Sequence, residues 1–254
     1  MANILILGAG SMGTAFSFPC SDNGHSVSIV GTHLENDFID KINSTRKHPA
    51  LDCEMKKNVK FFKFEKLKEE INNKIDLIVI AVVSKGIEWA SNEISKVLKN
   101  NVPILILTKG LAINNNKFEV LAHKMERLLK KNGTKETNIS AAGGPCLAKN
   151  LANKAHTAVV FANKDIKEVE KISKLVSTDY YHISTSEDVA GVEICAAIKN
   201  IFSMAVGASQ GLCDASKSKE KNYLNTAAAL MQESIYEMII FVEKLKGKKE
   251  TVIG

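Results

Sequence analysis

The sequence predicts an α/β protein in which a doubly wound, mostly parallel sheet is followed by an all-α region. Short apolar runs with strand character alternate with amphipathic stretches through most of the chain, which is typical of parallel strands joined by helices. From Glu187 onward the apolar residues recur with helical periodicity instead. We therefore expect two domains, over residues 1–186 and 187–254.

The expected elements follow one another along the chain in a regular order. A helix is expected over 14–23, and helical periodicity from 187 to 205 and over about 222–245 predicts two long helices near the end. Helical patterns also separate most of the strands. The strands are expected at 3–7, 26–30, 59–62, 76–82, 103–108, 138–142 and 157–162.

The composition is that of an ordinary folded protein, with 45% apolar and 24% charged residues in 254. At about 150 residues per domain, this length fits two modest domains or one large one, and the composition excludes a disordered or fibrous chain. The longest uncharged apolar run, 77–83, is much shorter than the roughly 20 residues that cross a bilayer, so we expect no membrane span. The start of the chain lacks a secretory leader pattern, which predicts a cytoplasmic protein.

The charge and the metal-ligand residues indicate neither nucleic acid nor metal as a partner. The net charge is +6, but only Arg46 and Arg127 are arginines, whereas nucleic-acid readers usually use more. The histidines never occur at the i, i+4 spacing of a helical metal site. The cysteines are odd in number and widely spaced, so we expect free thiols in a reducing compartment, at Cys20, Cys53, Cys146, Cys195 and Cys213.

A glycine-rich turn, Gly8-Ala9-Gly10-Ser11-Met12-Gly13, directly follows the first strand and precedes a helix. In this context Gly8 permits the tight turn, Gly10 lets the backbone approach a pyrophosphate, and Gly13 allows close packing of the helix. The turn therefore predicts a dinucleotide site. The alternative is a glycine-rich turn that binds no ligand.

The residues after the second strand leave the type of dinucleotide open. The segment Val30-Gly31-Thr32-His33-Leu34-Glu35 has no acid at the strand tip and no arginine nearby. Glu35 is able to reach the ribose of NAD, while Thr32 and His33 are able to bond either a hydroxyl or a 2′-phosphate. Alternatively, Glu35 only begins the next helix.

Two further segments lie where open sheets place their ligands. Lys109, in Thr108-Lys109-Gly110-Leu111, follows a buried strand and is expected to contact phosphate or nicotinamide; the alternative is a surface lysine. The turn Gly143-Gly144-Pro145-Cys146-Leu147-Ala148 offers amides to a second anion. Cys146 near a helix start is a possible nucleophile with a lowered pKa, although no histidine is near in sequence to act as its base.

Within the helical segment Gly191 to Asn200, the polar pair Lys199-Asn200 interrupts an otherwise apolar sequence. A lysine that is desolvated and close to another cation such as Lys109 has its pKa lowered, which suits proton transfer to a carbonyl oxygen. Lys199 is therefore the candidate catalytic residue. The alternative is a lysine that extends to solvent from a helix between domains.

The segments GAGSMG, TKGL, GGPCLAKNLANK and VEICAAIKN, in this order, resemble the NAD(P)-dependent glycerol-3-phosphate dehydrogenases along the whole chain. Residues 30–32 and 46–51 (RKHPAL) resemble the archaeal-type branch, which favours NADP over NAD. The resemblance implies a Rossmann-type NAD(P)-binding domain over 1–186 and a helical substrate domain over 187–254. It also implies reversible reduction of dihydroxyacetone phosphate to sn-glycerol 3-phosphate, which feeds glycerophospholipid synthesis.

The resemblance also implies roles for residues. Lys199 takes the place of the proton donor and acceptor, and Cys146 stands where the family commonly has Ser, Thr or a small residue. The implied cofactor contacts, with the glycines of the turn, are Gly8, Gly10, Ser11, Met12, Gly13, Thr32, Lys109 and Ala148. The implied substrate contacts are Lys109, Gly144, Cys146, Lys199 and Asn200.

The family continues beyond the position of 247–254 into a Gly-Asp-Leu segment, a Gly-Arg-Asn segment and further helices, so we expect an incomplete helical domain. Such a domain would leave apolar faces from 187 onward uncovered, which is compatible with association as a homodimer. Two other functions stay open: a catalytically incomplete dinucleotide-binding protein or fragment, and a related reductase of 2-hydroxy or keto acids.

Overall fold

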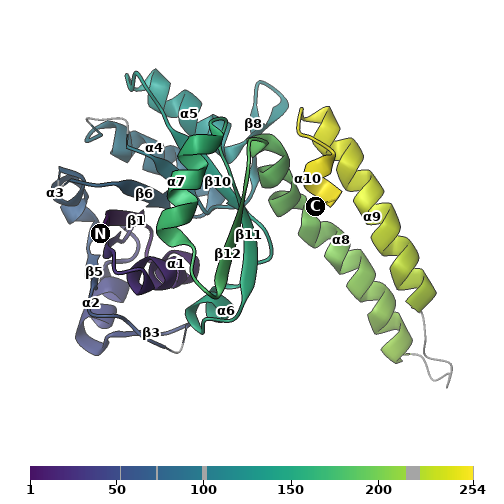
Figure 1. Ribbon diagram of the computed structural model, residues 1–254, viewed down its shortest axis with the longest axis horizontal. Coiled ribbons are helices and arrows are strands. Elements are labelled where there is room, and N and C mark those ends of the chain that lie inside the picture. The colour runs from purple at the N-terminus through teal and green to yellow at the C-terminus, as the bar shows by residue number, and fades with distance from the viewer. Residues whose placement is uncertain (52, 73, 99–101, 216–223, 254) are drawn as a thin grey trace.

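The computed structural model describes residues 1–51, 53–72, 74–98, 102–215 and 224–253. A sheet with helices on both faces forms the body of the molecule, and a pair of long helices extends from it (Figure 1). The predicted fold class is confirmed. The expected division between residues 186 and 187 falls between the last strand of the sheet and the first of the long helices.

The main sheet has eight strands in the order β12-β11-β10-β7-β6-β1-β2-β5. Neighbouring strands are parallel except for β10 and β11, which are antiparallel. All seven predicted strands are present, within two residues of their expected ends. The bounds of the eight strands are Asn3–Leu7 (β1), Ser26–Val30 (β2), Val59–Phe62 (β5), Leu77–Ile80 (β6), Ile104–Ile106 (β7), Ile139–Gly143 (β10), Thr157–Ala162 (β11) and Tyr181–Ser186 (β12).

The strand β12 and two short ribbons were not predicted. Residues 181–186 alternate between inward apolar and exposed polar side chains, so they lack the continuous apolar character of the inner strands. The ribbons pair Lys47–His48 (β3) with Cys53–Glu54 (β4), and Leu111–Asn114 (β8) with Lys117–Val120 (β9). Most of their side chains are exposed or only half-buried, which weakens the hydrophobic signal that reveals a strand.

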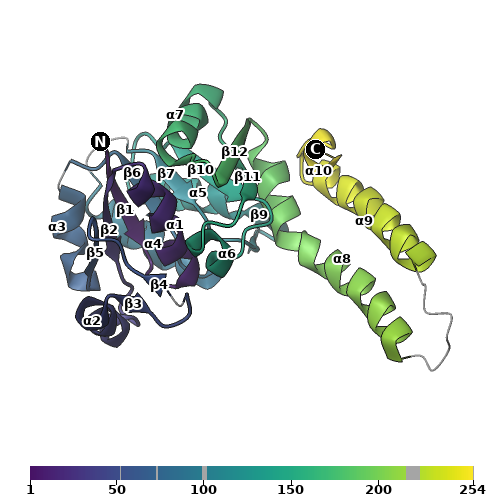
Figure 2. The ribbon, with the colours of Figure 1, turned by 60° about the horizontal axis from the view of Figure 1, so that its bottom comes forward.

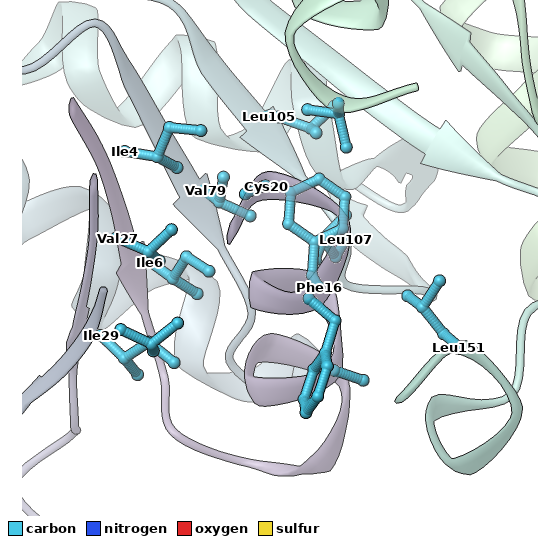
Figure 3. Packing of buried hydrophobic residues seen from close by; sticks show 14 of the residues in the cluster. Ile4, Ile6, Phe16, Cys20, Val27, Ile29, Val79, Leu105, Leu107 and Leu151 are labelled. Atoms are coloured by element: carbon cyan, nitrogen blue, oxygen red, sulfur yellow. The ribbon is translucent and has the colours of Figure 1, made fainter. Parts of the chain in front are cut away.

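Helices cover the sheet on both faces, as a doubly wound fold requires (Figures 1 and 2). One face carries α1 (Ser11–Asp22), α2 (Asn36–Thr45), α6 (Ala148–Ala152) and α7 (Ile166–Val176), and the other α3 (Leu67–Asn72), α4 (Ile87–Ser95) and α5 (Leu121–Lys131). On the first face, Phe16 and Cys20 of α1 pack against Ile6 and Val79 of the central strands (Figure 3). Burial of this apolar surface fixes the start of α1 against the end of β1.

The C-terminal region is a helical hairpin, as the helical periodicity predicted. Its helices are α8 (Val189–Ala215) and α9 (Leu224–Lys244), and the short α10 (Glu250–Ile253) returns to the start of α8 (Figure 2). The expected start of the second helix near residue 222 lies outside the described residues. Asp188 holds the return, because its Oδ2 accepts hydrogen bonds from Lys248 N at 2.7 Å and Thr251 Oγ1 at 2.6 Å.

The hairpin exposes large apolar side chains. Within α8, the segment Val189–Leu212 is long and apolar enough to cross a membrane by length and composition, with a mean hydropathy of 1.6. The prediction of no membrane span rested on the longest apolar run without charges, and this segment was not counted because Glu193 and Lys199 interrupt it. The same test is passed by core helices of soluble proteins, and 39% of the tested window of 18 residues is buried. The exposed side chains include Ile201, Met204, Leu212, Met231 and Tyr236.

Candidate active site

The glycine-rich turn joins β1 to α1 with the backbone geometry that three glycines allow. Gly8 has φ +110°, and a Cβ there would lie 2.7 Å from the carbonyl oxygen of Ala81. A Cβ on Gly13 would lie 2.3 Å from the carbonyl oxygen of Gly8. A Cβ on Gly10 would meet only Glu35 Oε1, at 4.0 Å. The space in front of Gly10 is therefore open, while Gly8 and Gly13 are enclosed by protein.

The helix α1 begins at Ser11, three residues earlier than predicted. Ser11 and Met12 thus belong to the first helical turn, whose backbone N–H groups have no partner within the helix and carry partial positive charge. Among the described residues, the only acidic group within 4 Å of a Cβ on Gly10 is that of Glu35. This end of α1 is suited to an anionic group such as a pyrophosphate.

Two lysine side chains converge on one backbone carbonyl at the carboxyl edge of the sheet. Lys109 Nζ donates a hydrogen bond to the carbonyl oxygen of Gly144 at 3.2 Å, and Lys199 Nζ donates to the same oxygen at 2.9 Å. Lys109 follows β7, Gly144 follows β10, and Lys199 lies on α8. Residues 109, 144 and 199 are distant in the sequence, and the fold brings them together.

Burial and charge shift the pKa values in this cluster. Burial lowers the pKa of the Lys199 ammonium from its usual value, and the nearby charge of Lys109 lowers it further. The pKa of the Cys146 thiol is raised, because the effect of burial exceeds that of the two lysines. The helix α6 begins only at Ala148, so Cys146 is not in its first turn. These observations argue against Cys146 as a thiolate nucleophile.

A small pocket of about 20 Å³ links the glycine-rich turn to the two-lysine cluster. Its lining includes the predicted cofactor contacts Met12 and Lys109, and Lys109 is also a predicted substrate contact together with Gly144 and Cys146. Among the other predicted contacts, Thr32 and Ala148 are half-buried and Asn200 is exposed. A larger pocket of about 490 Å³ lies around α5 and the start of α7 and contains none of these residues.

Close packing of α8 on β10 determines the position of Lys199. A Cβ on Gly143 would lie 2.6 Å from Val192 Cγ1 and 3.0 Å from the carbonyl oxygen of Val192. Only a glycine therefore lets α8 lie this close to the end of β10.

A buried carboxyl group next to this contact was missed from the sequence. Glu193 is 4% exposed, and its Oε2 accepts a hydrogen bond from Ala122 N at 2.9 Å, at the start of α5. Its Oε1 has no partner among the described residues. Burial raises the pKa of Glu193 to about 8, so the group is mostly protonated at neutral pH. The available signal was an acid inside an apolar helical segment, in the same motif as Lys199.

Within the described residues, no three His, Cys, Asp or Glu side chains are grouped as ligands for a metal ion. The two-lysine cluster is cationic, so its chemistry suits an anionic ligand rather than a metal.

Comparison with known proteins identifies the family. Residues 3–169 match the N-terminal domain, and residues 188–254 the C-terminal domain, of NAD-dependent glycerol-3-phosphate dehydrogenase. The chain belongs to this family. The NADP(+)-dependent glycerol-3-phosphate dehydrogenase of Archaeoglobus fulgidus is 30% identical over 251 residues, which are 99% of this chain and 72% of that protein.

Other members agree with the assignment. Glycerol-3-phosphate dehydrogenase [NAD(P)+] of an Exiguobacterium species is 29% identical over 258 residues, covering all of this chain and 70% of its own length. The crystal structure of glycerol-3-phosphate dehydrogenase from Coxiella burnetii has a TM-score of 0.82 at 25% identity, and the match covers all of this chain and 72% of that one. The family shows that the chain is an oxidoreductase of the nicotinamide-dinucleotide type.

The contrast between Gly13 and Gly10 is testable. We expect Gly13→Ala to lower the free energy of unfolding by about 1–3 kcal/mol, because the new methyl group collides with backbone. Gly10→Ala should leave thermal stability unchanged but weaken NADH and NADPH binding more than about tenfold, because it fills the open space. Differential scanning calorimetry and calorimetric titration measure the two effects. Tight dinucleotide binding by Gly10→Ala would contradict the assignment of this space to the ligand.

Glu193 predicts a pH dependence of stability. The folded state retains a proton up to about pH 8 that the unfolded carboxyl loses near its ordinary value of 4.5. The free energy of unfolding should therefore fall as pH rises through this window. Glu193→Gln has no carboxyl group to titrate, so its free energy of unfolding should not show this fall. Between pH 4.5 and pH 8, the difference in free energy of unfolding between the variant and the unaltered chain should therefore change by more than about 1 kcal/mol in favour of the variant.

Denaturant unfolding at several pH values measures this difference. Glu187→Gln, at an exposed carboxyl two residues before α8, is the matched control and should show no such change. Parallel pH curves for Glu193→Gln and the unaltered chain would disprove the interpretation.

Proposed function

We propose that the protein transfers hydride reversibly between NAD(P)H and dihydroxyacetone phosphate, giving sn-glycerol 3-phosphate. The observation that carries the proposal is the convergence of Lys109 and Lys199 on the Gly144 carbonyl, beside the glycine-rich turn. Two ammonium groups at one point suit a substrate with a carbonyl oxygen and a phosphate. This arrangement occurs in a chain whose relatives are named glycerol-3-phosphate dehydrogenases.

The residues present fit a dinucleotide. The open space in front of Gly10 and the N–H groups at the start of α1 would hold the pyrophosphate. We assign further cofactor contacts to Ser11, Met12, Thr32, Lys109 and Ala148, as the family resemblance implies. When bound, the nicotinamide ring supplies or accepts the hydride.

Lys199 is the proposed proton donor and acceptor. Its lowered pKa makes the ammonium a stronger acid than an ordinary lysine, so it gives its proton more readily to the carbonyl oxygen as negative charge develops there. Its positive charge stabilises that oxygen beforehand. In the reverse direction the neutral amine accepts the proton of the substrate hydroxyl.

The other substrate contacts are assigned to residues around the same carbonyl. Lys109 is exposed, which places its ammonium where a mobile phosphate group can reach it. Gly144, Cys146 and Asn200 complete the proposed set, and the neutral thiol of Cys146 is available as a weak hydrogen-bond donor. The supply of glycerol 3-phosphate to phospholipid synthesis, a cytoplasmic location and a homodimer remain predictions.

Replacement of Lys199 tests the proposal. We expect Lys199→Ala to reduce the rate of NAD(P)H oxidation with dihydroxyacetone phosphate by about 10²–10⁴-fold, because the proton donor is removed. Absorbance at 340 nm follows the reaction. Lys167→Ala, at an exposed lysine of α7, is the control and should leave the rate unchanged.

Two outcomes would count against the proposal. Full activity of Lys199→Ala would exclude Lys199 as the proton donor. Dinucleotide binding without turnover by the unaltered chain would favour the alternative, a dinucleotide-binding protein that is catalytically incomplete.

A further inference from the structure

Glu35 occupies a position that the sequence alone left undecided. It is the residue before α2, but its side chain makes no capping hydrogen bond to that helix. Instead, Oε2 accepts hydrogen bonds from Thr32 N at 2.6 Å and from Ala9 N at 3.2 Å. The carboxyl group therefore lies against the glycine-rich turn, 26 residues away in the sequence.

This position is where the adenosine ribose of a dinucleotide is expected. In an open parallel sheet the pyrophosphate binds at the start of the first helix, and the ribose lies towards the end of the second strand, where an acid accepts a bond from its 2′-hydroxyl. In this chain the acid is five residues beyond the end of β2, yet its side chain returns to the turn. Glu35 Oε1 lies 4.0 Å from the Cβ position of Gly10 and accepts no hydrogen bond from the described residues, so it is available to a ligand.

The charges near Glu35 are unfavourable for a 2′-phosphate. Two further acids are close to the start of α2. Glu65 Oε1 accepts a hydrogen bond from Asn36 Nδ2 at 3.4 Å, and Asp37 lies in the first turn of the helix. Lys63, in the loop after β5, is paired with Asp40 at 2.7 Å.

Both arginines of the chain are engaged elsewhere. The guanidinium group of Arg46 donates to the carbonyl oxygens of Met55 and Val59. Arg127, on α5, pairs with Glu119 at 2.8 Å. The bidentate arginine that commonly receives a phosphate is therefore committed to other partners.

We propose that Glu35 makes the site selective for NAD(H) over NADP(H), by accepting a hydrogen bond from the ribose 2′-hydroxyl and repelling a 2′-phosphate. The inference rests on the proposed function only in requiring that the site binds a nicotinamide dinucleotide. It is opposite to the preference that the family resemblance implied, and to the preference in the name of the Archaeoglobus relative.

Calorimetric titration of the whole chain with NADH and with NADPH, in the absence of substrate, tests the proposal. We expect NADH to bind at least about tenfold more tightly than NADPH. Glu35→Gln keeps the shape of the side chain and one acceptor oxygen for the N–H groups of Thr32 and Ala9, but it removes the charge and the second acceptor, so it should reduce this ratio at least about fivefold. Asp37→Asn removes a neighbouring charge that is not bonded to the turn, and it should leave the ratio close to that of the unaltered chain.

A salt series on the unaltered chain gives a second measurement that needs no variant. Between 50 mM and 500 mM salt the ratio of the NADPH and NADH dissociation constants should fall, because salt screens the repulsion of the 2′-phosphate. Equal or tighter binding of NADPH by the unaltered chain, or an unchanged ratio in Glu35→Gln, would overturn the role of Glu35 while leaving the proposed function intact. Binding of neither dinucleotide would overturn both.

Discussion

The close approach of α8 to the end of β10 is the constraint on which the site depends. Gly143 has no side chain, so Val192 of α8 packs directly on its backbone. Lys199 lies seven residues, or two helical turns, beyond Val192, which places both on the same face of α8 about 10 Å apart. The contact between Val192 and Gly143 therefore also positions Lys199 to reach the carbonyl oxygen of Gly144, the residue after Gly143.

The remaining site residues depend on the direction of the strands. The glycine-rich turn follows β1, Lys109 follows β7 and Gly144 follows β10, and these strands are parallel members of one sheet. Their carboxyl ends therefore meet at one edge, where side chains from distant parts of the sequence lie close together. Glu193, which bonds the start of α5, holds α8 to the body of the molecule from a second side.

Most of the fold could be predicted from the sequence because the central strands are continuously apolar and the long helices have clear periodicity. The prediction failed where that signal is weak. Strand β12 carries exposed polar residues such as His182 and Ser184, and the β8–β9 ribbon exposes Ile113 and Phe118. A short, half-exposed strand owes its structure to its neighbour in the sheet, which the local sequence does not reveal.

In the site, too, features that depend on neighbouring residues in the sequence were predictable, and contacts between distant residues were not. The residues of the glycine-rich turn were identifiable because the turn and its strand are adjacent in sequence. The side-chain contacts of Glu35 and Glu193 were not, because their partners, Ala9 and Ala122, are 26 and 71 residues away. An acid near a helix end or within a helix has several ordinary explanations, and only the packed structure selects one.

The two ammonium groups at Gly144 have a consequence for the free protein. Both nitrogens are bonded to one oxygen, so they lie within about 6 Å of each other, where like charges repel. The fold therefore holds the groups most useful for chemistry in an arrangement that opposes its own stability. A negatively charged ligand relieves this repulsion when it arrives, so part of its binding free energy originates in electrostatic strain that the polypeptide already carries.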